Sequence, residues 1–113
     1  MIKFSKARQA GYNPKGRRWD IRLSHNNKKV GEINKSFSDW KCRHPNYTLE
    51  LMGTIIQEGI YNTIKTKRFY DTLGEAKGVA RAILKDKELL ISILTCQSHK
   101  IIKRDVNQAW SAT

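Results

Sequence analysis

The sequence predicts an α+β domain, in which an antiparallel sheet of three to five strands carries one or two C-terminal helices packed on one face. Short segments with alternating apolar and polar residues fill the N-terminal half, whereas apolar residues at helical spacing dominate after residue 72. Strands that precede helices along the chain are typical of α+β folds, in which the helices gather on one side of the sheet. The 113 residues suffice for one domain with its own core.

The first predicted strands form a hairpin. Residues 19–23 alternate apolar and polar side chains, and residues 28–34 do the same until the alternation slips by one position at Gly31, which indicates a β-bulge. The turn-forming residues 24–27 lie between these two strands and connect them. Ahead of the hairpin, Ile2 and Phe4 are candidates for a short edge strand.

Further strands are predicted before the helices begin. Residues 37–44 alternate around Trp40, and residues 61–69 are rich in β-branched and aromatic side chains. Residues 47–60 fit either a strand or a short helix, and both interpretations stay open. Trp19 and Trp40 are expected in the core, because large aromatic side chains dominate protein interiors.

The clearest helix begins after Thr72. Thr72 and Glu75 have the spacing of a capping box, in which side-chain oxygens accept hydrogen bonds from the free N–H groups of the first turn. Lys77, Arg81 and Lys85 are four residues apart, so they form one basic stripe on this helix. We expect the stripe to face solvent, behind the sheet.

The domain organisation follows from these elements. We expect a basic amino-terminal arm at residues 1–17, a single α+β domain at 18–104 and a C-terminal tail at 105–113. The segment after residue 86 is predicted to be helical and to fray in the tail.

Charge is the strongest functional signal. The net charge is +12 and the sequence pI is about 10.0. Residues 1–43 carry 12 Lys and Arg against three Asp and Glu, whereas residues 44–113 carry ten against seven. A basic field of this strength attracts polyanions, and a pI above about 9 is typical of nucleic-acid-binding domains. The expected partner is therefore DNA or RNA.

The predicted binding residues combine the arm with the sheet face that no helix covers. Bases on such a face suit phosphate neutralisation, and neighbouring aromatic residues suit base stacking. The ten predicted nucleic-acid-binding residues are Lys15, Arg17, Arg18, Arg22, Lys28, Lys29, Lys41, Arg43, Lys65 and Lys67.

The order of strands followed by a helix resembles the three-stranded DNA-binding domains of the AP2 and integrase amino-terminal type. The resemblance covers about residues 17–85, and its most specific part is the aromatic-x-Thr-x-x-Glu-Ala run from Tyr70 to Ala76. It implies that the sheet contacts DNA and that one helix braces the sheet. The additional segment at residues 47–60 departs from that family, so the strand order stays open. In style, the chain is also similar to small basic early proteins of tailed bacteriophages, which bind nucleic acid or block a host factor.

Enzyme motifs are missing from the sequence. It contains none of the patterns GxGxxG, GxxxxGK[ST] and GxSxG. We therefore expect a protein without catalytic activity and without a cofactor. Cys42, His44, Cys96 and His99 supply two cysteines and two histidines, but their spacing is not that of a zinc finger, so no metal is expected.

A competing interpretation is an interaction protein. Its basic surface would dock on an acidic patch of a host enzyme or defence complex and inhibit it, as a phage-encoded inhibitor would. No membrane partner is expected, since the longest apolar run, residues 89–94, is too short to span a bilayer. No segment resembles an export signal, so we expect a cytoplasmic protein, in the host cytoplasm if it is viral.

Overall fold

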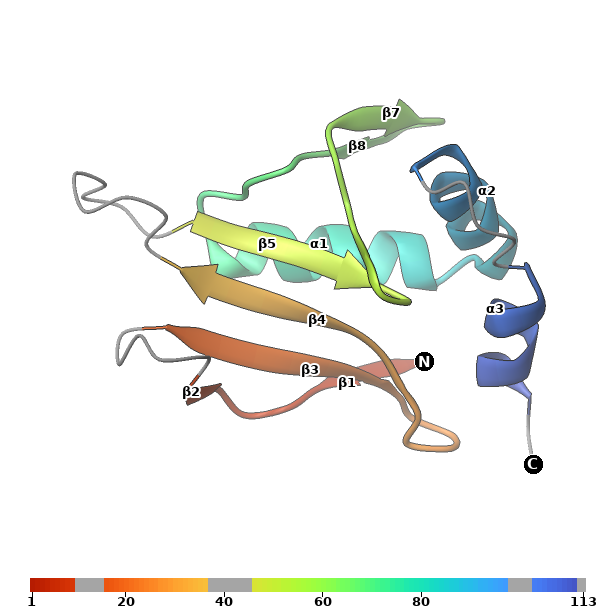
Figure 1. Ribbon diagram of the computed structural model, residues 1–113, viewed down its shortest axis with the longest axis horizontal. Helices are drawn as coiled ribbons and strands as arrows, with labels where there is room; N and C mark the ends of the chain where they lie inside the picture. Colours follow the sequence, from red (N-terminus) through yellow and green to blue (C-terminus); the bar gives the residue numbers. More distant parts are fainter. Residues whose placement is uncertain (10–15, 37–45, 98–102, 112–113) are drawn as a thin grey trace.

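The computed structural model describes residues 1–9, 16–36, 46–97 and 103–111, and it has the predicted α+β architecture (Figure 1). The strands are β1 (Ile2–Phe4), β2 (Arg8–Gln9), β3 (Arg17–Leu23), β4 (Lys29–Ser36), β5 (Asn46–Leu51), β6 (Thr54–Ile55), β7 (Gly59–Tyr61) and β8 (Ile64–Thr66). The helices are α1 (Leu73–Leu84), α2 (Lys87–Gln97) and α3 (Lys103–Trp110).

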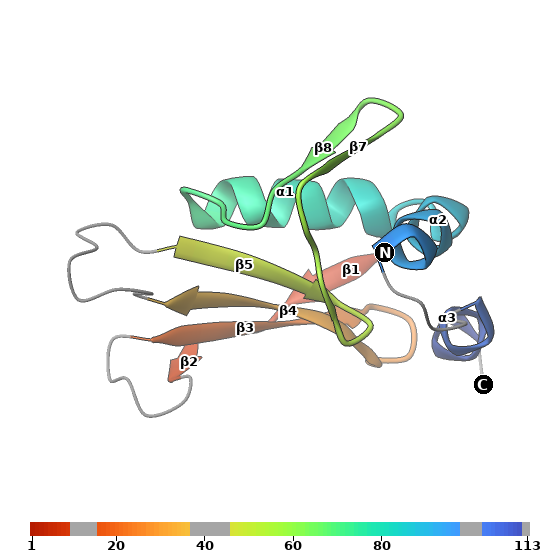
Figure 2. The same cartoon turned by 45° about the horizontal axis from the view of Figure 1, so that its top comes forward.

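The main sheet is antiparallel, with the order β1-β3-β4-β5-β6, and β2 also pairs with β3. Strands β7 and β8 form a separate two-stranded hairpin. Helix α1 lies along one face of the main sheet, while α2 and α3 follow at one end of it (Figure 2). Successive side chains of each strand point to opposite faces of the sheet. One set therefore packs against α1, and the other set lies on the opposite face.

The core lies between the sheet and α1. Buried aliphatic side chains from the three central strands face the helix, which contributes its own small and branched residues. The buried residues of this layer are Ile21, Leu23, Ile33, Leu49 and Leu51 on the strands and Ala76, Ala80 and Ile83 on α1. The small alanine side chains allow the helix to approach the sheet closely.

The predicted bulge at Gly31 is confirmed. Ile21 pairs with Gly31, whereas the next residue of β3 pairs with Lys29, so Val30 is the extra residue of β4. The bulge lets Val30 enter the core, where its side chain is 2% exposed. Glycine is required beside it, because a Cβ at position 31 would collide with the carbonyl oxygen of Glu50.

The predicted start of α1 is confirmed as well. The hydroxyl of Thr72 accepts a hydrogen bond from the backbone N–H of Glu75 at 3.1 Å. The carboxylate of Glu75 pairs with the ammonium of Lys67, at 2.7 Å. Just before the helix, the backbones of Tyr70 and Tyr47 exchange two hydrogen bonds, which fasten the entry of α1 to β5.

The prediction of one continuous strand over residues 61–69 is wrong. The chain reverses at Asn62, whose φ of 58° lies in the left-handed region that asparagine adopts more readily than most residues. The ambiguous residues 47–60 contain all but the first residue of β5, the whole of β6 and the first two residues of β7. The predicted strand at residues 37–44, with Trp40, lies outside the described residues. Trp19 is half-buried, and its ring centroid lies 6.1 Å from that of Tyr47.

The C-terminal segment is more ordered than expected. Residues 105–110, predicted to lie in a tail, belong to α3, in which Val106 and Ala109 are buried. The side-chain amide of Asn26, in the β3–β4 turn, donates a hydrogen bond to the carbonyl of Ala109 at 2.9 Å and fixes α3 to the sheet. Among the described residues, no helix is both long and apolar enough to cross a membrane.

Candidate nucleic-acid interface

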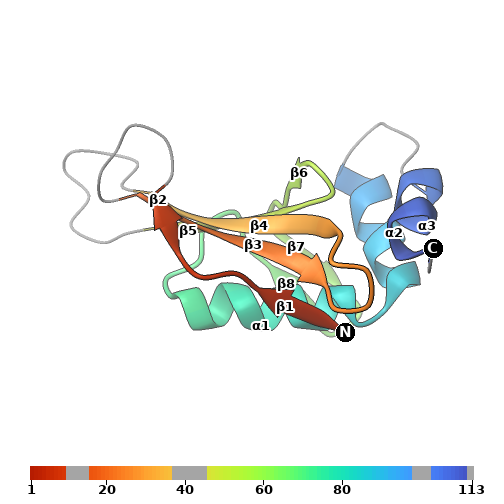
Figure 3. The ribbon, with the colours of Figure 1, turned by 90° about the horizontal axis from the view of Figure 1, so that it is seen from below.

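The candidate site is the face of the main sheet opposite α1, here called the open face. None of the described helices covers it (Figure 3). The strand register places two polar rows across it, Arg18–Asn34–Thr48 and Asp20–Glu32–Glu50 on β3, β4 and β5. At the edge of the sheet, Lys3 of β1 lies opposite Arg22. The open face therefore combines bases with a row of three carboxylates.

Asp20 is the centre of this arrangement. The residue is only 6% exposed. Its carboxylate lies 2.9 Å from the guanidinium of Arg8, 3.3 Å from the ammonium of Lys29 and 3.6 Å from the guanidinium of Arg22. A buried carboxylate needs such partners, because its charge would otherwise be desolvated without compensation.

Glu32 extends the network to the next strand. Its carboxylate lies 3.3 Å from the ammonium of Lys29, which therefore joins Glu32 to Asp20. The Nε of Arg18 lies 3.1 Å from Glu32 and donates a hydrogen bond to the side-chain oxygen of Asn34 at 3.0 Å. Glu50 stands directly opposite Glu32 in the register, so two acids face each other.

The three carboxyl groups respond differently to this environment. Burial by itself would raise the pKa of Asp20, but the hydrogen bonds and charges of Lys29 and Arg8 outweigh it and lower the pKa. Burial opposes ionisation of Glu32 too, yet hydrogen bonds from Glu50 and Lys29 lower its pKa. The pKa of Glu50 is raised, first by burial and then by its hydrogen bond to Glu32 and the charge of that neighbour. In the Glu32–Glu50 pair, neutral Glu50 therefore donates the hydrogen bond and Glu32 accepts it.

The bases lie above the acids and remain accessible to solvent. Exposed fractions of their side chains are 54% for Arg8, 39% for Lys29 and 36% for both Arg18 and Arg22, against 8% for Asp20. Arginine has five N–H donors, so an ion pair on one side leaves others for a ligand. The carboxylates consequently restrict the orientation of bases whose side chains remain partly exposed to solvent.

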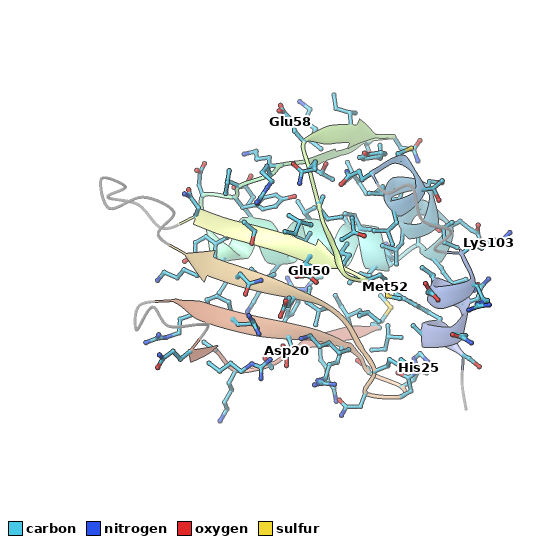
Figure 4. The ribbon with its side chains drawn as sticks, viewed as in Figure 1. Asp20, His25, Glu50, Met52, Glu58 and Lys103 are labelled. Carbon is cyan, nitrogen blue, oxygen red and sulfur yellow. The ribbon has the colours of Figure 1, made fainter. Side chains whose placement is uncertain are left out.

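A hollow of about 290 Å³ opens at one end of this face. It is lined by Lys29, Val30, Gly31, Glu32, Glu50, Met52 and Gly53. Figure 4 shows Asp20 and Glu50 on neighbouring parts of the open face, with Met52 just beyond the end of β5. The hollow thus offers a cation, two carboxyl groups and a thioether within one shallow depression.

The predicted binding residues are only partly brought together. Arg18, Arg22 and Lys29 lie on the open face, and Lys28 is exposed between β3 and β4. Arg17 is on β3 but on the side of the sheet that faces α1, since it alternates with Arg18. Three predicted residues, Lys15, Lys41 and Arg43, lie outside the described residues.

The placement of Lys65 and Lys67 on the same sheet face as these bases is wrong. Lys65 belongs to the separate β7–β8 hairpin, and Lys67 follows that hairpin and pairs with Glu75 of α1. The reason is the turn at Asn62, which breaks the long strand on which the prediction depended.

Several residues of the open face were not predicted from the sequence. They are Lys3, Arg8, Asp20, Glu32, Asn34 and Glu50. The alternation of residues 19–23 already placed Asp20 on the same face as Arg22, and this signal could have identified the first carboxylate. Glu32 and Glu50 become neighbours only through the β4–β5 register, which the sequence pattern does not reveal.

The zinc question is not decided by the geometry. Within the described parts of the chain, no group of three or more His, Cys, Asp or Glu side chains is arranged to hold a metal ion. Cys96 is exposed on α2, whereas Cys42, His44 and His99 lie outside the described residues. The expectation of no metal stays a prediction.

Comparisons of the chain with protein-family models, with curated proteins and with solved structures give no match. Function is therefore inferred from the chemistry of the surface itself.

Proposed function

We propose that the protein binds nucleic acid through the open face, without catalysing a reaction. The observation that carries this proposal is a sheet face uncovered by helices, on which four bases are held in place above three carboxyl groups. These bases are Arg8, Arg18, Arg22 and Lys29. The same face is the one with which the three-stranded domains that residues 17–85 resemble contact DNA.

Electrostatics supports binding of a polyanion. The whole chain carries a net charge of +12, so a nucleic acid is attracted from a distance set by the Debye length, about 8 Å at physiological ionic strength. On the open face itself, five bases, including Lys3 at the edge, stand against three carboxyl groups, and Glu50 is the acid whose pKa is raised. The charge of the whole surface thus attracts the nucleic acid over a distance, whereas the fixed bases of the open face orient it once it is bound.

The carboxylates have a defined part in this proposal. Free arginine and lysine side chains lose about 2 kcal/mol of rotamer entropy when a ligand fixes them. Asp20 and Glu32 already restrict Arg8, Arg22 and Lys29 in the absence of ligand. Phosphate contacts therefore cost less entropy, and the carboxylates act as positioning residues rather than as ligand contacts.

The test is a salt titration of binding to labelled DNA and RNA oligomers, single- and double-stranded, by fluorescence anisotropy. We expect log K to fall linearly with log salt, with a slope that reports the number of phosphate contacts. Undetectable binding of every oligomer at low salt would exclude the proposal.

A matched pair of variants locates the contact. Arg18→Gln/Arg22→Gln removes two charges from the open face, and Lys65→Gln/Lys103→Gln removes two from exposed positions on β8 and α3. The first should flatten the salt slope by about two units and weaken binding at least tenfold, since each base that no longer neutralises a phosphate lowers the slope by about one unit. The control should keep the wild-type slope.

Both variants must first show a wild-type circular dichroism spectrum and a folded melting transition. Equal losses of affinity in the two variants would mean that only the total charge matters, and that the open face makes no direct contact with the nucleic acid.

A further inference from the structure

The outer edge of β1 carries no strand in the described part of the chain, since β1 pairs only with β3. Met1 accepts a hydrogen bond from Ser24, and Ser5 donates one to Asp20, so the odd-numbered residues of β1 direct their backbone groups toward β3. The N–H and C=O groups of Ile2 and Phe4 consequently point to the open edge. Such an edge is a template for an added strand.

The basic stripe of α1 runs beside this edge. The ammonium of Lys77 lies 5.1 Å and the guanidinium of Arg81 lies 5.0 Å from the centroid of the Phe4 ring. Lys85, the C-cap residue of α1, lies beside Met1 and Ile2 around a hollow. The prediction that the stripe faces solvent holds for Arg81 and Lys85, which are exposed, whereas Lys77 is half-buried. The prediction did not include the contact of Lys77 and Arg81 with Phe4 of the edge strand.

The charges of this stripe are not neutralised. Within the described residues, Lys77, Arg81 and Lys85 form no ion pair, and no Asp or Glu lines the hollows beside them. The open face differs, because Arg8, Arg18, Arg22 and Lys29 each have a carboxylate partner there. An acidic ligand would supply what the stripe lacks.

Next to the stripe lies an apolar depression. One hollow of about 400 Å³ is lined by Met1, Ile2, Arg81, Ala82, Leu84 and Lys85. A second hollow, of about 200 Å³, shares Met1, Ile2, Leu84 and Lys85 and extends to Leu23, His25 and Trp110. Met1 is 81% exposed above them. The two neighbouring hollows share four lining residues, and most of their lining is apolar apart from Arg81, Lys85 and His25; together they are here called the β1–α1 groove.

We propose that the β1–α1 groove binds an extended acidic segment of a partner protein, which adds to the sheet as a strand beside β1. The free backbone groups of Ile2 and Phe4 select a polypeptide, because nucleic acid cannot continue a peptide ladder. Alternate side chains of an added strand point to the same side, about 6.7 Å apart. One apolar side chain then fills the hollow beside Ile2, and a carboxylate two residues along meets Lys77 and Arg81. This proposal is independent of nucleic-acid binding, since it uses none of the open-face residues.

The experiment uses the full chain, labelled with ¹⁵N, and a blocked heptapeptide with Leu at its centre and Glu at the alternate positions. We expect chemical-shift changes confined to residues 1–5 and 77–85. A peptide with Lys in place of Glu and a peptide with N-methylated backbone amides should bind at least tenfold more weakly. The first control removes charge complementarity and the second removes the ladder hydrogen bonds.

Variants of the protein test the two halves of the groove separately. Arg81→Gln/Lys85→Gln should weaken binding of the Glu peptide at least tenfold, while Lys65→Gln/Lys103→Gln should leave it unchanged. Ile2→Pro removes an outward N–H without removing a hydrogen bond to β3, so it should also weaken binding, whereas Ile2→Val should not. Preserved dispersion of the amide resonances shows that each variant is folded.

Four outcomes would overturn the proposal. The first is that millimolar Glu peptide causes no chemical-shift changes, and the second is that the Lys peptide or the N-methylated peptide binds as tightly as the Glu peptide. The third is that the chemical-shift changes fall on the open face instead. The fourth is that an oligonucleotide displaces the Glu peptide and produces the same shifts at residues 77–85. The last outcome would assign the groove to nucleic acid. Absence of oligonucleotide binding alone would contradict the proposed function and leave the groove unaffected.

Discussion

The open face and the β1–α1 groove both carry bases, but in opposite electrostatic settings. On the open face, Asp20 and Glu32 lie beneath the bases and hold them. In the groove, the bases of α1 have no carboxylate partner among the described residues, and two of them lie on the ring of Phe4 instead. The position of a base relative to acids, rather than the net charge of +12, therefore distinguishes the two surfaces.

This difference separates charges that contribute to folding from charges that remain available to a ligand. Removing a base from the open face leaves a buried or half-buried carboxylate with fewer partners, which costs stability. Removing a base from the groove leaves no unpaired group behind. The same substitution should consequently change stability on one surface and binding alone on the other.

The largest expected effect is that of Asp20→Asn. This change removes the carboxylate that contacts Arg8, Arg22 and Lys29, and it should lower the free energy of unfolding by about 2–3 kcal/mol. That is below the 3–5 kcal/mol typical of fully buried pairs, because the bases keep contact with water. Urea denaturation followed by circular dichroism measures it.

The pH dependence gives a second readout on Asp20. Its pKa is lowered in the folded protein, so its stabilisation is complete above the unfolded value, near 3.8, and is lost as the pH falls through the folded pKa. The difference between wild type and Asp20→Asn should therefore be constant near neutral pH and shrink below about pH 4. A difference under about 0.5 kcal/mol at pH 7 would show that the network makes little contribution to stability.

An intermediate effect on the free energy of unfolding is expected from the same type of substitution, Lys to Gln, made separately on the open face and in the groove. Lys29→Gln removes an ammonium that contacts both Asp20 and Glu32, and Lys85→Gln removes one from the rim of the groove. The first should cost about 1 kcal/mol, since its side chain is 39% exposed and the ion pairs are partly screened. The second should stay within about 0.5 kcal/mol, as surface substitutions usually do. Equal costs in urea denaturation would remove the distinction between the two surfaces.

The fold was predictable where local patterns coincide with tertiary contacts. The Thr72 cap and the slipped alternation at Gly31 are local signals, and both were confirmed, although the carboxylate of Glu75 pairs with Lys67 rather than with the backbone. The prediction of a single strand at 61–69 was wrong because the chain reverses at Asn62. β-branched and aromatic residues on both sides of this turn favour strands equally, so their composition does not reveal the turn between them. The sequence predicted a helical segment that frays after residue 104, but residues 105–110 stay helical. Val106 and Ala109 are buried there, and Asn26, which is distant in sequence, donates a hydrogen bond to the carbonyl of Ala109.

The candidate site was less predictable than the fold. Bases could be counted from the sequence, and the parity of β3 placed Arg18 and Arg22 on one face. Whether a base is paired depends on the registers of β2, β4 and β5, which bring Arg8, Glu32 and Glu50 to that face. The strand register is set by the whole sheet and its core. The composition could therefore reveal the net charge of the chain, but not which bases have carboxylate partners.

The smallest expected effect concerns Glu50, and its sign is opposite to that of Asp20. Glu50 faces Glu32 directly, with Lys29 and Arg18 as the nearest bases, and its pKa is raised by burial and by that neighbour. The folded state therefore holds the Glu50 proton more tightly than the unfolded state. As the pH rises from the unfolded value of about 4.5 through the raised pKa, the wild type loses stability.

Glu50→Gln keeps the hydrogen bond to Glu32 and cannot ionise, so it avoids this loss. The variant should match the wild type below about pH 4.5 and exceed it by roughly 0.5 kcal/mol near pH 7, the size expected for removing one opposed pair of like charges on a sheet. Glu32→Gln is the matched control, and it should be destabilising at pH 7, because Lys29 and Arg18 then lose their partner. Urea midpoints at pH 4, 5, 6 and 7 measure both variants. If Glu50→Gln lowered stability at pH 7 as Glu32→Gln does, Glu50 would be ionised and paired with a base, and the open face would carry three stabilising carboxylates instead of two.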